Sequence, residues 1–350
     1  MAQPPRPLLV VYTGGTLGML PSAAGLAPGS DIGRRLDAAL ASLPPARRAD
    51  LPPFELVETP QPIDSSAATP ATWQALAELI AAQHGRQRYA GIVVLHGTDT
   101  LAWSAASLAY QLQGIDIPVV VSGAMLPLEA EGSDALGNFE AALRFAAEQG
   151  LKEVAVCFAG KLLRATRTRK WHTQAADAFS SPNYPLLGEL VDHRPVLYPS
   201  RGLAEQQRGA PRFELPDYIG KHASNSVVRI ALWPGIAAWQ VAAWLEPSAV
   251  QGALLEVWGG GNAPQDPELL GVLARASGEG KLLVALSQCP HGGIEIGHYA
   301  AGQGLADAGV LSADAMTPEA AFTKLVHLLA QPLDDTERRR RFLTSLAGER

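Results

Sequence analysis

Two short segments carry hydroxyl and carboxyl side chains in a pattern suited to chemistry. The first, TGGT at residues 13–16, ends a run of apolar β-formers with two threonines and two glycines. The second, HGTDT at residues 96–100, ends another such run. Acyl transfer requires a nucleophile, a group that takes its proton, and donors for the oxyanion that develops. Thr16 could attack, and Thr98 with Asp99 could prepare a proton relay or a water molecule.

Each segment also has a plainer interpretation when it is taken alone. TGGT could be a strand-ending turn, because glycine permits positive φ and threonine hydroxyls satisfy loose backbone groups. Thr98 or Asp99 could cap the helix that follows. Glycine-rich turns also bind phosphate, although neither the GxGxxG pattern nor the P-loop pattern is present. The occurrence of both segments at predicted strand ends favours the catalytic interpretation.

The TGGT and HGTDT segments are expected to be positioned by the parallel β-strands that precede them. Strand-like runs are followed by turns and amphipathic helical patterns along the first half of the chain; the runs are LLVVY, IVVL, IPVVVS and KEVAVCF. A helix is also expected from Thr69, the N-cap before a proline at the first helical position. Strands that are apolar throughout and alternate with helices indicate a parallel sheet covered on both faces. Ligands bind at the carboxyl ends of such strands, where TGGT and HGTDT both lie.

We predict an α/β fold in two parts. Residues 1–194 would form a larger N-terminal domain, a three-layer α/β/α arrangement with a mostly parallel sheet, which carries the catalytic residues. A segment rich in proline, glycine and charge follows, and we predict a linker over residues 195–225. Three further apolar runs and a late helix predict a smaller C-terminal α/β domain over residues 226–350.

Composition and charge exclude several classes of protein. The 350 residues are 47% hydrophobic and 18% charged, as in ordinary globular proteins. The net charge of -6 argues against a nucleic-acid partner, so the four arginines at 338–341 are interpreted as a solvated helix face.

No run is long enough to span a membrane, and the apolar run near the N-terminus is too short for a secretory signal, so we expect a cytoplasmic protein. Cys157 and Cys289 lie far apart in apolar runs, which favours buried reduced thiols.

The sequence resembles the bacterial L-asparaginase family, and in particular its cytoplasmic type I members. The resemblance covers nearly the whole chain and rests on the segments YTGGTLGM, PIDSS, LHGTDTLAWSAASLAY, VVVSGAMLP, LRATRTRKWHTQAADAFSSPNYPLLGE, GGGNAP, LSQCPHGG and DAMTPEAAFTKL. It implies an amidohydrolase that converts L-asparagine and water to L-aspartate and ammonia through a threonine acyl-enzyme, without metal or organic cofactor. It also implies a homodimer or homotetramer with active sites at the subunit interface.

The resemblance implies roles for four catalytic residues. Thr16 matches the nucleophile, and Thr98 and Asp99 match the second threonine and the carboxylate that binds the α-amino group of the substrate. Lys170 matches the lysine of a Thr-Lys-Asp group, and we choose it over Lys161 because it stands at the family spacing before AFSSPNY. Burial would make such a lysine a base by lowering its pKa. Without the resemblance, Lys170 is better explained as one more charge in a basic run.

The resemblance also implies substrate-binding residues. Ser65 matches the residue that holds the α-carboxylate, and Thr98 and Asp99 contribute again. Ala124 matches a position whose backbone carbonyl contacts the leaving amide. Asn262 matches an asparagine that reaches into the active site of the neighbouring subunit.

Several positions depart from the family pattern. Leu26 occupies the place of a loop tyrosine that hydrogen-bonds the nucleophile, and Ala67 replaces an acidic residue after the serine pair. Tyr12 is not assumed to substitute, because an adjacent strand residue should point differently. Glu256 and Arg169 stand where type I members have the arginine and threonine of an allosteric asparagine site, so we expect that site to be lost.

Two alternatives to an asparaginase remain at this point. One is a related amidohydrolase that acts on glutamine or supplies ammonia to a tRNA-dependent amidotransferase, although the latter would need an extra tRNA-reading region. The other is an amino-acid-binding protein that has lost turnover through Leu26.

Overall fold

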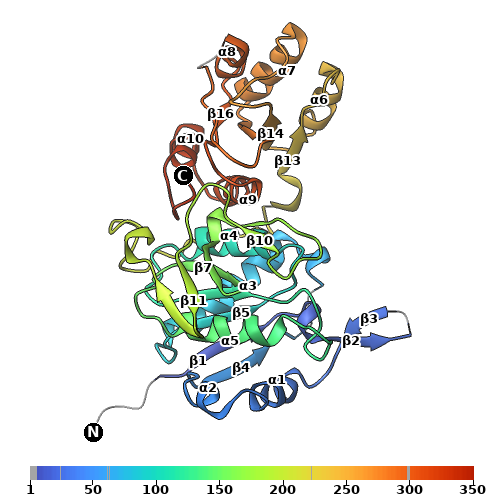
Figure 1. Cartoon of the computed structure of the whole chain (residues 1–350). Helices are drawn as coiled ribbons and strands as arrows, with labels where there is room; N and C mark the ends of the chain where they lie inside the picture. The colour runs from blue at the N-terminus through green and yellow to red at the C-terminus, as the bar shows by residue number, and fades with distance from the viewer. Residues whose placement is uncertain (1–5, 24, 61, 63, 222, 298–299) are drawn as a thin grey trace. The chain divides into compact units, whose positions relative to one another are not determined.

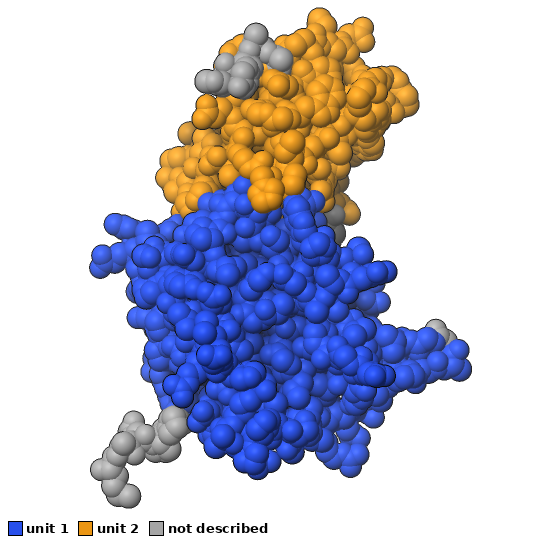
Figure 2. All heavy atoms as spheres, viewed as in Figure 1, with its two compact units in different colours: residues 1–215 blue, residues 216–350 orange. Residues whose placement is uncertain are grey.

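The computed structural model describes residues 6–23, 25–60, 62, 64–221, 223–297 and 300–350. The chain divides into two compact units, unit 1 over residues 1–215 and unit 2 over residues 216–350 (Figure 2). Both are α/β, as predicted, and each unit has a hydrophobic core of its own.

Unit 1 is built on an eight-stranded sheet with the order β12-β11-β8-β7-β6-β5-β1-β4 (Figure 1). The strands are β1 (Leu8–Tyr12), β4 (Phe54–Glu58), β5 (Ile92–Leu95), β6 (Val119–Ser122), β7 (Val154–Phe158), β8 (Lys161–Arg164), β11 (Gly188–Val191) and β12 (Arg194–Leu197). The pairs from β4 to β7 are parallel, and those from β7 to β12 are antiparallel. Strands β1, β5 and β7 are buried at every residue, which explains why their sequences are apolar throughout.

Helices cover both faces of this sheet, which confirms the predicted three layers. They are α1 (Ile32–Ala41), α2 (Pro45–Ala49), α3 (Pro70–Gly85), α4 (Leu101–Gln111) and α5 (Ala135–Ala146). Helices α1 and α5 pack on one face, and α3 and α4 pack together on the other. Helix α3 begins as expected, with Thr69 as the N-cap and Pro70 in the first turn. Two short antiparallel hairpins complete unit 1: β2 (Met19–Ser22) with β3 (Gly25–Pro28), and β9 (Arg169–Lys170) with β10 (Phe179–Ser180).

The segment expected as a linker over residues 195–225 is divided between the two units. Its first residues lie in β12, where Pro195 pairs with Leu190 of β11 at the edge of the sheet. A proline is tolerated there because an edge strand leaves one row of N–H groups unpaired. Unit 1 therefore continues to Leu215, beyond the expected boundary at residue 194.

Unit 2 is built on a four-stranded parallel sheet with the order β13-β14-β15-β16. The strands are β13 (Val227–Ala231), β14 (Gly252–Val257), β15 (Leu282–Ser287) and β16 (Leu311–Ser312). The helices are α6 (Ala238–Leu245), α7 (Pro267–Gly278), α8 (Ala300–Asp307), α9 (Pro318–Leu329) and α10 (Asp335–Leu343). Helix α9 packs against β13 and β14, and α10 packs against α9.

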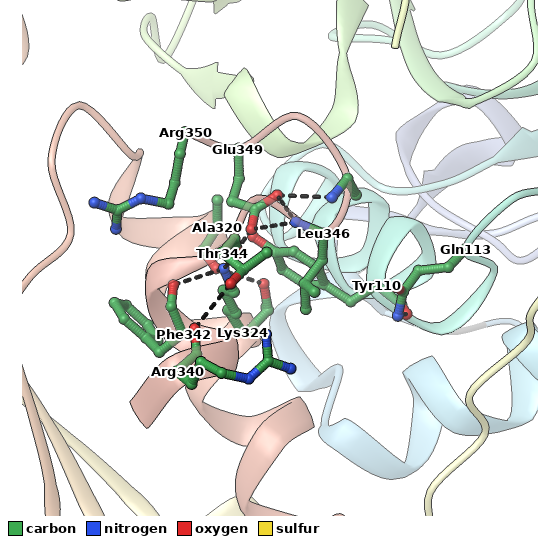
Figure 3. A network of polar contacts seen from close by, with 12 residues as sticks. Tyr110, Gln113, Ala320, Lys324, Arg340, Phe342, Thr344, Leu346, Glu349 and Arg350 are labelled. Carbon is green, nitrogen blue, oxygen red and sulfur yellow. Dashed lines mark hydrogen bonds and ion pairs between the residues drawn. The ribbon is translucent and has the colours of Figure 1, made fainter. Parts of the chain in front are cut away.

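A buried ion pair ties the end of unit 2 to helix α9 (Figure 3). Lys324 and Glu349 are both fully buried and bonded to each other. The Lys324 ammonium also donates to the carbonyls of Phe342 at 2.8 Å and Thr344 at 2.6 Å. The Glu349 carboxylate accepts hydrogen bonds from the backbone N–H groups of Leu346 and Ala347. Both buried charges are therefore compensated.

The arginine run and the cysteines differ in part from expectation. Arg338, Arg339 and Arg341 of α10 each donate to a group within unit 2, so they do not simply form a solvated face. Cys157 is buried, as expected, but the same prediction for Cys289 was wrong: it is exposed, because β15 ends two residues before it. Among the described residues, no helix is both long and apolar enough to cross a bilayer.

Candidate active site

Four of the predicted motifs meet at the carboxyl edge of the large sheet. TGGT follows β1, HGTDT follows β5, the SGAM turn follows β6, and Ser65 follows β4. These strands are neighbours in the order β6-β5-β1-β4, and all of their pairs are parallel. After β1, the chain forms β4, which pairs with one edge of β1, and then β5, which pairs with the other edge. The order in which strands are added to the sheet therefore reverses at β1. Ligand sites in open α/β sheets lie at such a point.

The glycines of the first two motifs allow their backbones to touch. A Cβ built on Gly15 would lie 2.5 Å from the Gly97 Cα, and one on Gly97 would lie 2.4 Å from Ser65 Oγ. Gly15 has a φ of +91°, which favours glycine independently of the available space. Glycine at 15 and 97 therefore brings TGGT, HGTDT and Ser65 into contact.

The HGTDT turn is held in place by side chains that the sequence analysis did not single out. Thr100, not Thr98 or Asp99, is the N-cap of α4, and its hydroxyl donates to the Ser65 carbonyl at 2.7 Å. The buried His96 ring lies with Nδ1 2.8 Å from the Gly97 carbonyl and Nε2 3.0 Å from the Ser104 hydroxyl. Since a carbonyl only accepts, Nδ1 carries the proton and Nε2 accepts from Ser104.

Desolvation keeps the His96 ring neutral. Burial lowers the pKa of His96, and the bond to the Gly97 carbonyl only partly opposes that shift. The only hint in the sequence is a serine eight residues after the histidine, Ser104, which lies in the first turn of α4.

Lys170 joins the site from outside the large sheet. It lies in β9, opposite Phe179 of β10. Its ammonium donates to Thr98 Oγ1 at 2.9 Å and to Asp99 Oδ1 at 2.7 Å, so the structure brings these three predicted residues together. Lys161 instead pairs with Asp177 on the surface.

This Thr98–Asp99–Lys170 group is still open to solvent in unit 1. Thr98 is buried, but the Lys170 side chain is 23% exposed and that of Asp99 is 63% exposed. A lysine that acts as a base is expected to be removed from water. The part of the chain that the structure describes removes the Lys170 side chain from water only in part.

Thr16 begins a one-turn 3-10 helix, Thr16–Gly18, directly after Gly15. The β2–β3 hairpin follows at once, and Leu26 lies in β3 opposite Pro21 with 51% of its side chain exposed. Tyr12 is buried in the core, where its phenol packs against Gly18, and burial raises its pKa.

Ala124 is buried in the loop after β6, and helix α5 holds this loop by side chains that the sequence analysis missed. Asn138 Nδ2 donates to the Gly123 carbonyl at 3.0 Å. The Asp134 carboxylate accepts the Met125 N–H at 2.9 Å. The peptide groups on both sides of Ala124 are therefore fixed from one helix.

Asn262 belongs to unit 2, in a tight turn after β14. Its backbone and that of Trp258 each donate to the other at 2.9 Å. Its side-chain Oδ1 is buried and has no hydrogen-bond partner among the described residues. The described residues also contain no group of three or more His, Cys, Asp or Glu side chains that could hold a metal ion.

Comparison with known proteins gives matches over both units. The family model "Asparaginase, N-terminal" matches residues 7–201, and "Glutaminase/Asparaginase C-terminal domain" matches residues 226–342. The chain is 37% identical to L-asparaginase 1 of Escherichia coli (strain K12) over 345 residues, which cover 98% of each chain. The crystal structure of L-asparaginase I from Vibrio cholerae matches with a TM-score of 0.86 and 36% identity over 99% of each chain. The thermostable L-asparaginase from Thermococcus kodakarensis matches with a TM-score of 0.85 and 31% identity over 98% of each chain.

Proposed function

Because the chain belongs to the asparaginase family, we propose that it is an L-asparaginase, an amidohydrolase that converts L-asparagine and water to L-aspartate and ammonia. The observation that carries the proposal is the pair of bonds from Lys170 to Thr98 and Asp99 at 2.9 and 2.7 Å. This group stands at the sheet edge where the Thr16 turn packs against HGTDT. A nucleophile and a proton relay thus converge on one edge, as acyl transfer requires.

In the proposed reaction, Thr16 Oγ1 attacks the side-chain amide carbon of asparagine and its proton is taken up as the bond forms. The tetrahedral intermediate collapses when the amide nitrogen receives a proton and leaves as ammonia. The resulting aspartyl ester on Thr16 is then attacked by water, which releases L-aspartate and restores the threonine. Thr98, Lys170 and Asp99 would relay the protons of both steps.

The proposed binding roles suit a small zwitterion. The Asp99 carboxylate would receive the α-amino group of asparagine, and its 63% exposure leaves that carboxylate accessible. Ser65 would bind the α-carboxylate, and the Ala124 carbonyl would contact the leaving amide. The fixed peptides on both sides of Ala124 support the last role, since a preorganised carbonyl loses little entropy on binding.

Ammonia release from the purified protein tests the proposal. We expect release from L-asparagine, and Thr16→Ala should lower turnover by several orders of magnitude with the fold intact. Thr336→Ala, the same change at an exposed site on α10, should leave turnover unchanged. A substantial residual rate in Thr16→Ala would rule out this nucleophile. Release from glutamine alone, or calorimetric binding of asparagine without turnover, would instead identify a glutaminase or a binding protein.

We also propose that the protein is a homodimer or homotetramer in which Asn262 completes the site of a neighbouring subunit. The open Lys170 and Asp99 side chains support this arrangement, because a neighbouring subunit could cover them. Mixing Thr16→Ala subunits with Asn262→Ala subunits should restore part of the activity that each lacks alone. Failure of all mixtures, together with a monomeric mass in solution, would contradict it. A cytoplasmic location stays a prediction.

A further inference from the structure

We propose that Arg35 and Glu129 form a clamp that holds the turn carrying Thr16 and the base of the β2–β3 hairpin. Both would be positioning residues for the reaction proposed above, on which this inference rests. Neither residue lies in a motif noted in the sequence, and 94 positions separate them along the chain.

Arg35, on helix α1, uses its whole guanidinium group on one small region. Its Nε and Nη2 atoms donate to the two carboxylate oxygens of Glu129 at 2.6 and 2.7 Å. Nη1 donates to the Gly18 carbonyl at 2.8 Å, and Nη2 also reaches the Met19 carbonyl at 3.4 Å. Gly18 ends the 3-10 turn that Thr16 begins, and Met19 starts β2. A bidentate pair of this kind fixes direction as well as distance, because the guanidinium is planar.

The other side of the same turn is bonded to the segment that carries Glu129. The Leu128 N–H donates to the Leu17 carbonyl at 3.0 Å. The Gly18 carbonyl accepts a second bond, from the Gly29 N–H at 3.1 Å, where the chain returns from the hairpin. The turn is therefore held from helix α1, from the 128–129 segment and from the far end of the hairpin.

The orientation of the hairpin depends on the contacts at its base. Within the described parts of the chain, strands β2 and β3 pair only with each other, and Figure 1 shows them standing out from the rest of unit 1. An isolated two-stranded hairpin is marginally stable in water. The orientation of β2–β3 must therefore come from its base, where Arg35 is only 13% exposed. The hydrogen bond from Arg35 lowers the pKa of Glu129, so the pair stays ionised at neutral pH.

Loosening this clamp should act on the chemical step more than on substrate binding. The proposed binding residues Ser65 and Asp99 are held by other contacts, whereas the Thr16 turn is bonded directly to the clamp through Gly18. Displacement of a reacting atom by about 1 Å can lower a rate by about 100-fold. Arg35→Ala and Glu129→Gln should therefore lower kcat roughly 10- to 100-fold while KM changes little.

The experiment compares these variants with neighbours that share their chemistry. The control variants are Arg34→Ala and Glu131→Gln. Arg34 lies on helix α1 beside Arg35, Glu131 lies on the same loop as Glu129, and both side chains are exposed. We expect kcat within about twofold of the parent for both controls, since exposed charges contribute little. The double variant Arg35→Ala/Glu129→Gln should be no slower than the worse single variant, because the effects of two substitutions in one bonded pair do not add.

Hydrogen exchange separates positioning from general destabilisation and does not depend on activity. In Arg35→Ala and Glu129→Gln, amides of residues 17–23 and 25–29 should exchange faster while those of β5 and β6 keep their protection. Unchanged exchange and unchanged kcat would overturn the clamp. So would a loss of protection throughout unit 1, because it would assign the pair to general stability. If the parent protein releases no ammonia, the proposed function fails, and the exchange result still decides whether the clamp exists.

Discussion

The backbones of Gly15 and Gly97 lie so close that a Cβ on Gly15 would come within 2.5 Å of both the Cα and the amide nitrogen of Gly97. The two residues belong to different motifs and follow adjacent parallel strands, β1 and β5. No larger residue at position 15 avoids this overlap without moving a strand end, because the obstacle is backbone. This contact therefore fixes the position of Thr16, the proposed nucleophile, which directly follows Gly15.

Gly97→Ala should disrupt the active site. Its new Cβ would lie 2.4 Å from Ser65 Oγ and 2.7 Å from Ser65 Cβ, so Ser65 must move. We expect a large fall in kcat/KM for asparagine. Gly137→Ala on α5 is the control: it meets no atom within 4 Å and should stabilise the protein by about 0.5–1 kcal/mol. Equal activity of the two variants would show that the strand ends can separate freely.

Lys170→Met should be severely impaired, because the bonds from its ammonium to Thr98 and Asp99 would be lost. Lys161→Met should be nearly neutral, since it removes only a surface pair with Asp177. Methionine keeps the apolar length of the side chain, so the comparison isolates the amine. Initial rates of ammonia release check both, and the opposite ranking would show that Lys161 is the lysine used.

Leu26→Tyr should raise kcat more than it changes KM. A tyrosine at this place could share the proton of Thr16, and such a contact acts mainly in the transition state. Leu26 is 51% exposed, so the larger side chain displaces no core packing. Leu343→Tyr, at a leucine that is 46% exposed on α10, should leave steady-state kinetics unchanged. A fall in kcat of Leu26→Tyr with normal folding would show that Thr16 is activated by another route.

The dependence of rate on asparagine should be hyperbolic. Glu256 is occupied in an ion pair with Arg229 on the neighbouring strand β13, and Arg169 lies over the Trp171 ring. Neither position offers the residue that an asparagine effector would need, and cooperativity requires an effector that distinguishes two states. A Hill coefficient well above one, abolished by changing either residue, would contradict this.

Glu349→Gln should destabilise unit 2 by about 3–5 kcal/mol, because it leaves the buried Lys324 charge without its partner. The double variant Lys324→Met/Glu349→Gln should recover part of that loss. Glu337→Gln, which removes an exposed pair with Arg340, should have little effect. Chemical denaturation of the four proteins checks the ranking, and a loss no larger for Glu349→Gln than for Glu337→Gln would contradict it.

The same pair predicts a pH dependence. Burial opposes the charge on Glu349, but Lys324 and two backbone N–H groups outweigh it and lower the pKa of Glu349 below that of an unfolded glutamate. Its contribution to the free energy of unfolding is therefore complete above about pH 4.3 and is lost as the pH falls through the lowered folded value. Glu349→Gln should flatten this part of the acid profile.

Local rules were enough to predict much of this protein from its sequence. Residues 8–12 and 92–95 are apolar throughout, and a strand buried on both faces requires that pattern. Thr69 and Pro70 marked the start of α3 because capping depends on neighbouring residues alone. Motifs after parallel strands necessarily share one edge of the sheet, so the convergence of TGGT and HGTDT followed from their positions.

Contacts between distant positions required the tertiary structure. The basic segment carries two lysines, Lys161 and Lys170, and composition does not distinguish them. The β9–β10 pairing places the Lys170 ammonium beside Thr98, 72 positions away. The abundance of proline, glycine and charge after residue 194 suggested a linker, yet Pro195 lies in an edge strand, and whether a strand is at the edge or the centre depends on the sheet order. Arg35 and Glu129 carry no local signal, since an ion pair between two elements depends on how helix α1 and the 128–129 segment pack, and no periodicity within either element encodes that packing.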